Sequence, residues 1–115
     1  MEERELYRDL SRMIRGELSS AEVKRLAQRE GFRSFSELCE TRLPEELAKV
    51  RLGTRDVLAR IDKYRRRATD LYELWFWADE LYNISFNHTI AYEPRSEDLI
   101  LTSLSAISVI ANERL

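Results

Sequence analysis

Few side chains in the sequence could carry acid–base, nucleophilic or metal chemistry. His88 is the only histidine and Cys39 the only cysteine. A hydrolase triad or a metal site needs a base, and His88 is expected in a loop, without a Glu-x-x-His or His-x-x-x-His partner on a helix face. Cys39 shares an apolar helical face with Phe35, which favours an inert, buried thiol. The sequence therefore predicts no enzyme, no catalytic residue, no metal site and no cofactor.

An aromatic cluster among carboxylates is a candidate binding site. Trp75 falls on the apolar stripe of one expected helix, whereas Trp77 falls on another stripe with Glu73 and Glu80. Either Trp77 is covered by segment 84–92, or it is exposed among acidic side chains. The exposed arrangement is typical of a binding hot spot, because interface anchors are enriched in tryptophan. The partner-binding residues that it predicts are Glu73, Trp77, Asp79, Glu80, Tyr92 and Glu93.

The two parts of the chain carry opposite charge. Residues 1–68 hold 17 Lys and Arg against 13 Asp and Glu, a balance of +4, and residues 69–115 hold 2 against 8, a balance of −6. If the parts stay apart in space, the acidic part is a surface for a basic protein partner. The alternative is that these charges only solvate helix surfaces.

The elements that must position these residues are helices. Glycine and proline are scarce, with three and two copies, and helix-forming residues dominate. Capping boxes at 19–22 and 34–37 mark two helix starts. We expect an all-α fold, a single domain over residues 1–115 built as a bundle of five to six helices. The last helix, from Ser96, is apolar around almost its whole circumference, so we expect it to be buried at the centre.

Two segments are less regular. Residues 44–53 suit a short helix that buries Leu47, Val50 and Leu52, followed by a longer helix capped by Thr54. Residues 84–92 alternate between polar and apolar types, as a loop or one extended strand does. A loop is favoured because no second strand is evident.

Residues 22–40 contain Leu26-Ala-Gln-Arg-Glu-Gly-Phe-Arg-Ser-Phe-Ser-Glu-Leu38. This string resembles the core of bacterial helix-turn-helix and ribbon-helix-helix regulators. The resemblance implies DNA binding through Arg29, Arg33, Ser34 and Ser36. A plain αα-hairpin has the same pattern, and Glu37 and Glu40 would meet DNA phosphates. Nucleic acid is therefore the alternative partner rather than the leading one.

A second resemblance covers residues 56–115. Trp77-Ala78-Asp79, Ile90-Ala-Tyr-Glu93 and a helix ending in Ile110-Ala-Asn112 resemble small all-helical bacterial toxin-immunity proteins of the colicin-D-immunity kind. The resemblance implies a protein without enzyme activity that masks a basic toxin with an acidic surface. We take binding of a basic protein as the leading expectation for function, and DNA-binding regulation as the alternative.

The expected setting is the bacterial cytoplasm. No apolar run approaches the roughly 18 residues of a membrane span. The charged start lacks the apolar core of a secretory signal, and a single cysteine fits a reducing compartment. We expect no membrane partner, and either a monomer or a homodimer.

Overall fold

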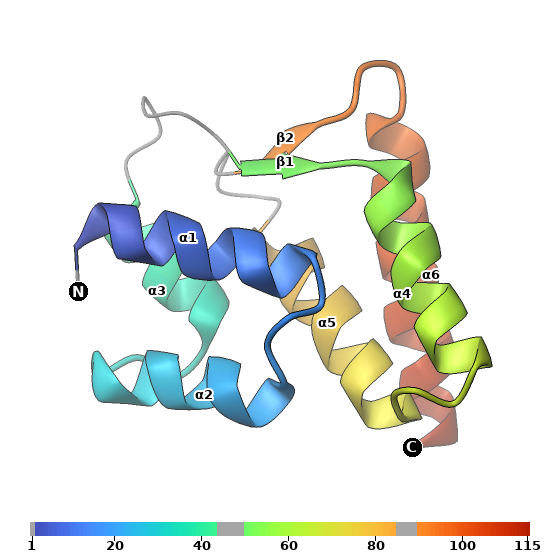
Figure 1. Ribbon diagram of the computed structural model, residues 1–115, viewed down its shortest axis with the longest axis horizontal. Helices are drawn as coiled ribbons and strands as arrows, with labels where there is room; N and C mark the ends of the chain where they lie inside the picture. The colour runs from blue at the N-terminus through green and yellow to red at the C-terminus, as the bar shows by residue number, and fades with distance from the viewer. Residues whose placement is uncertain (1, 44–49, 85–89) are drawn as a thin grey trace.

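The computed structural model describes residues 2–43, 50–84 and 90–115 of the chain. Figure 1 shows its elements, which in chain order are α1 Glu3–Ile14, α2 Ser20–Arg29, α3 Phe35–Arg42, β1 Val50–Leu52, α4 Thr54–Arg65, α5 Leu71–Ile84, β2 Ile90–Tyr92 and α6 Glu97–Arg114. The all-α class is confirmed, since the only sheet in the described part of the chain has two short strands. One hydrophobic cluster joins residues from α1 through α6.

Local capping signals start the early helices. At α2, the Oγ of Ser19 accepts a hydrogen bond from the N–H of Glu22 at 3.2 Å, and the N–H of Ser19 donates to the Glu22 carboxylate at 3.1 Å. This reciprocal pair confirms the predicted capping box. At α3, the Oγ of Ser34 accepts from the N–H of Glu37 at 3.1 Å, which is one half of the predicted box. A second acceptor at the start of α3 is the carboxylate of Glu80, on α5, which binds the N–H of Ser36.

The two strands correct both predictions for the irregular segments. Val50 and Leu52 belong to β1 and not to a helix, and residues 90–92 form β2 and not a loop. β1 and β2 pair in parallel, with Val50 opposite Ile90 and Leu52 opposite Tyr92. Parallel strands need a long crossover connection, here α4 and α5, so each three-residue strand finds its partner only through the tertiary fold. Residues 44–49, including Leu47, lie outside the described part of the chain.

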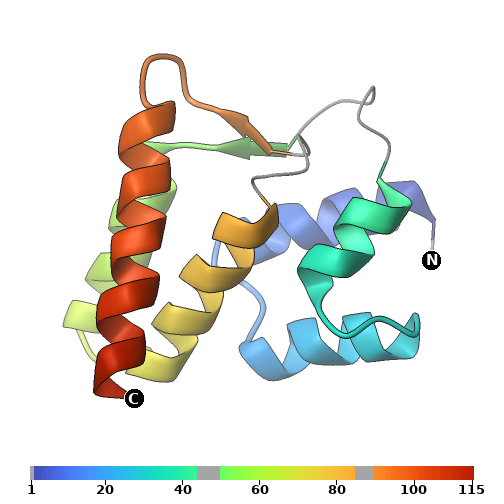
Figure 2. The same cartoon turned by 180° about the vertical axis from the view of Figure 1, so that it is seen from behind.

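The central helix is α5 rather than α6. It packs against all five other helices, whereas the main contacts of α6 are with α5 and α4. Figure 2 shows α6 in red along the edge of the molecule. Only Ile100, Leu104 and Ala111 of α6 are buried. The central position expected for the last helix is therefore wrong, because its nearly continuous apolar surface is covered on one side alone.

No helix in the described ranges is long and apolar enough to cross a lipid bilayer.

Candidate functional site

Acidic side chains from the second half of the chain bind helix N-termini in the first half. The carboxylate of Glu73, on α5, accepts hydrogen bonds from the backbone N–H and the Oγ of Ser20 at 3.0 Å each, at the start of α2. The carboxylate of Glu93, just after β2, accepts from the N–H and the Oγ1 of Thr54 at 2.9 and 2.8 Å, at the start of α4. Carboxylates are stabilised there by unpaired N–H groups and the helix dipole. These two predicted partner-binding residues are therefore engaged inside the molecule.

The parallel strand pair places Glu93 at that helix start. β1 leads directly into α4, and the N–H of Glu93 continues the ladder by donating to the carbonyl oxygen of Leu52 at 3.0 Å. Thr54 is thus the first residue of α4 and donates its hydroxyl to Glu93, rather than acting as the cap itself. The bonds from Thr54 lower the pKa of the Glu93 carboxyl below its ordinary value.

Glu80 plays the same part at α3 but is buried. Glu80 is only 6% exposed. Its carboxylate accepts a hydrogen bond from the N–H of Ser36 at 3.1 Å. Burial raises the pKa of Glu80, and the backbone N–H groups of Ser36 and Phe35 oppose that rise. Nearby Cys39 is fully buried, and burial raises the pKa of its thiol, as expected of an inert cysteine. Glu80 therefore completes the α3 helix start that Ser34 only half caps.

Trp77 is buried, with 2% of its surface exposed. Its indole Nε1 donates a hydrogen bond to the carbonyl oxygen of Met13 at 2.9 Å. The exposed arrangement is therefore wrong. The alternative prediction, that segment 84–92 covers Trp77, falls partly on residues 85–89, which lie outside the described ranges. Trp75, expected to face inward, is half-buried and lies against Tyr72 with 5.6 Å between ring centroids.

The remaining predicted partner-binding residues also make contacts within the fold. Asp79 accepts a hydrogen bond from the Oγ of Ser108 on α6 at 3.0 Å. Tyr92 is half-buried and packs against the core. All six residues are therefore engaged within the fold and do not form one exposed face.

The predicted nucleic-acid residues lie around the turn between α2 and α3. Arg29 and Arg33 are exposed, but Ser34 caps α3 and the N–H of Ser36 is bound by a carboxylate. Glu37 is exposed on the same helix. The structure thus contains the expected pair of helices, with both serines engaged in the helix start.

A different apolar surface lies on α6. Leu99, Val109 and Ile110 are each more than half exposed. Thr102 and Ala106 are exposed between them, at the three- and four-residue spacing of one helical face. We call Leu99, Thr102, Ala106, Val109 and Ile110 the α6 outer face. The apolar positions of this face are visible in the sequence, but there they were interpreted as a sign that the whole helix is buried.

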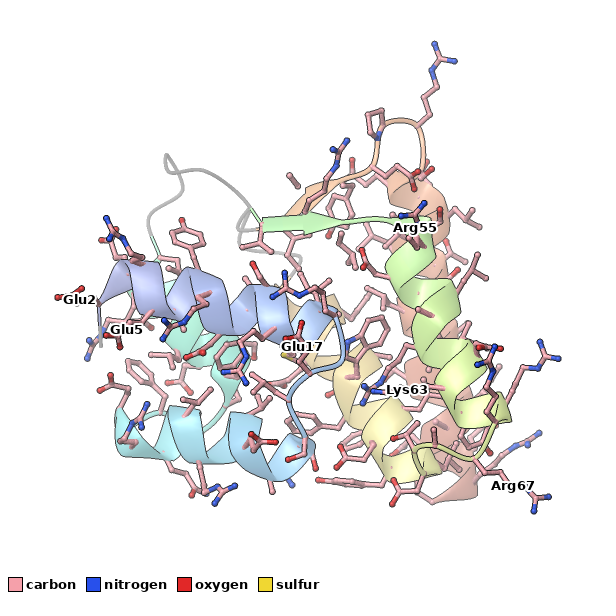
Figure 3. The ribbon with its side chains drawn as sticks, in the orientation of Figure 1. Glu2, Glu5, Glu17, Arg55, Lys63 and Arg67 are labelled. Carbon is pink, nitrogen blue, oxygen red and sulfur yellow. The ribbon has the colours of Figure 1, made fainter. Side chains whose placement is uncertain are left out.

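A cationic pocket lies between the end of α1 and α4. Its volume is about 330 Å³, and its charged lining residues are Arg15, Arg55, Asp56, Arg60 and Lys63. Figure 3 shows Lys63 extending from α4 towards the end of α1, whereas Arg67 extends away from the molecule. The Nζ of Lys63 donates to the carbonyl oxygen of Gly16 at 3.1 Å. Sequence reasoning missed Arg60, although its position three residues after buried Val57 placed it on the inward face of α4.

Neither a protein-family model, nor a curated protein, nor a solved structure matches this chain. Within the described ranges, no group of three or more His, Cys, Asp or Glu side chains could hold a metal ion. The expectation for His88 falls on a residue outside those ranges.

Proposed function

We propose that the chain is a protein-interaction domain that binds its partner through the α6 outer face. The observation that carries the proposal is the exposure of Leu99, Val109 and Ile110 along one stripe of a helix. Single apolar residues on a surface are common, but several on one face of a helix favour an interaction site. The surface around Trp77, by contrast, is already occupied by the fold.

The charges of α6 suggest the chemistry of the partner. Glu97, Asp98 and Glu113 are exposed on this helix, against one exposed cation, Arg114. An apolar stripe with an acidic N-terminal end, formed by Glu97 and Asp98, is complementary to an amphipathic helix with a basic end. We therefore still propose a basic protein partner, but one that binds the α6 outer face rather than the residues around Trp77. An immunity-type role, in which this face masks a basic toxin, stays a prediction within it.

A site-specific photocrosslinker at position 106, in the middle of the α6 outer face, tests the proposal in cells of the source organism. We expect position 106 to crosslink a protein with a basic amphipathic segment. The matched control carries the crosslinker at position 37, which is exposed on α3. The crosslink from position 106 should disappear in an Ile110→Glu background, because a buried carboxylate in the interface costs several kcal/mol.

Two results would overturn this proposal. One is the same set of crosslinked proteins from positions 106 and 37. The other is a crosslink from position 106 that survives Ile110→Glu. A crosslink to a second copy of the chain, with a dimer by light scattering, would also contradict a basic partner and assign the face to self-association.

A further inference from the structure

Arg60 is a buried cation with too few partners. The residue is 6% exposed, and its Nε is buried without a hydrogen-bond partner. Its Nη2 reaches the carbonyl oxygen of Glu73 only at 3.5 Å, and it forms no ion pair with any carboxylate of the described residues. Its guanidinium lies over the ring of Trp77, 5.9 Å from the centroid. The Glu73 carboxylate attracts this charge from beyond ion-pair distance, but burial still lowers the pKa of Arg60 and its Nε has no acceptor. A buried cation with so little direct pairing is costly, so a further anion would stabilise it.

The pocket beside Arg60 concentrates positive charge. Four cations line it, Arg15, Arg55, Arg60 and Lys63, against a single carboxylate. That carboxylate, on Asp56, already accepts the N–H of Gly53 at 2.8 Å. Arg15 is paired with Glu17, which leaves three cations without an ion-pair partner in the described part of the chain. Glu73 and Glu93 act on Arg60 and Arg55 from outside the lining, but no carboxylate of the described residues forms an ion pair with either of them. An anion in the pocket could therefore pair directly with these cations.

We propose that this pocket binds the phosphate group of a small molecule, held by Arg60 and Lys63 with Arg55 at the rim. The guanidinium fork and the ammonium group are the side chains that bind phosphate oxygens most strongly. The volume of about 330 Å³ is at the small end of ligand pockets, which suits a phosphate or a short phosphate ester. The site shares no residue with the α6 outer face, so it is independent of the proposed function.

Trp77 provides a direct reporter of the proposed site, because the guanidinium of Arg60 lies over its ring. We would titrate the Trp75→Phe variant, in which Trp77 is the only tryptophan, with inorganic phosphate at constant ionic strength. A saturable change in Trp77 emission is expected. Glycerol 3-phosphate is the second probe: similar affinity assigns the site to free phosphate, and tighter binding assigns it to a phosphate ester.

Variants separate the pocket from general charge effects. Lys63→Gln and Arg55→Gln should each weaken phosphate binding by about tenfold, because each removes a charge-assisted contact. The control is Arg65→Gln, which removes an exposed cation on α4 that does not line the pocket. These three positions are exposed, so the variants are expected to fold. No saturable binding, equal losses in all three variants, or tighter binding of acetate than of phosphate would overturn the proposal.

Discussion

The indole N–H of Trp77 donates to the carbonyl oxygen of Met13 across 2.9 Å, which fastens the central helix α5 to the last turn of α1. Trp77→Phe removes this bond and leaves unfilled space in the core. We expect it to lower the free energy of unfolding by about 2–4 kcal/mol. Trp75→Phe, at a half-buried site, should cost less than about 1 kcal/mol. Urea unfolding of both variants measures the difference, and equal losses would contradict the burial of Trp77.

Gly16 follows α1 in the left-handed region, with a φ of +74°. A Cβ there would lie 2.7 Å from the Nη1 of buried Arg60. Gly31 has a φ of +83° but open space around its Cβ position, so Gly31→Ala should cost only the backbone strain, about 1–2 kcal/mol. Gly16→Ala should cost more, because Arg60 must also shift. Thermal unfolding compares the two, and a smaller loss at Gly16 would refute the close contact.

We expect Glu80 to stabilise the fold as a hydrogen-bond acceptor rather than through its negative charge. Glu80→Gln keeps an oxygen for the Ser36 N–H without a buried charge, so its stability at neutral pH should equal or exceed that of the wild type. Glu80→Ala leaves that N–H unpaired and should cost about 1–3 kcal/mol. These values come from urea unfolding.

The raised pKa of Glu80 also sets a pH dependence. The folded state holds this proton more tightly than the unfolded state, so its stabilising contribution is complete below the unfolded pKa. That contribution is lost as pH rises through the folded pKa. The stability of the wild type relative to Glu80→Gln should therefore fall as pH rises. A relative gain over the same range would be inconsistent with a buried carboxylate at this position.

Glu93 should show the opposite sign. Its pKa is lowered in the folded state, so its stabilising contribution is present above the unfolded pKa and is lost as pH falls through the folded pKa. Wild type should thus be more stable than Glu93→Gln at neutral pH, and the two should converge in acid. Glu40→Gln, which removes an exposed carboxylate of α3, is the control. A difference from wild type that persists unchanged in acid would rule out the ionic cap on Thr54.

The position of α6 at the edge makes a further prediction. Leu104 is fully buried, so Leu104→Ala should lower the free energy of unfolding by about 2–5 kcal/mol. Ile110 is more than half exposed, and Ile110→Ala should change it by only about 0.5 kcal/mol. Chemical denaturation measures both. Similar large losses at the two positions would mean that α6 is enclosed on both sides.

Local signals in the sequence predicted the helices well, because helix starts depend on neighbouring residues. Ser19 and Glu22 cap α2 from within four residues of sequence. The strands escaped prediction because each has three residues and its pairing is made across the crossover of α4 and α5. A period-two pattern needs more residues than that to be recognised.

The candidate site was less predictable, since it depends on which polar residues are buried. Glu80 and Arg60 are each 6% exposed, although Glu and Arg are almost never fully buried. Sequence periodicity also failed on α5, because a helix with neighbours on several sides has no single inward stripe. The charge difference between the two parts of the chain is evident from the sequence. That carboxylates of the second part bind helix starts in the first part is evident only from the tertiary contacts.

The carboxylate caps have a consequence for how the protein is made. The N–H groups of Ser20, Ser36 and Thr54, at the starts of α2, α3 and α4, are bound by Glu73, Glu80 and Glu93, so these acceptors follow their helices in the same order along the chain. A ribosome synthesises the three helices before it adds the first of these acceptors. Until then, water must take the place of each later carboxylate at those N–H groups. We therefore expect the first half of the chain to reach its most stable form only after the second half has been translated.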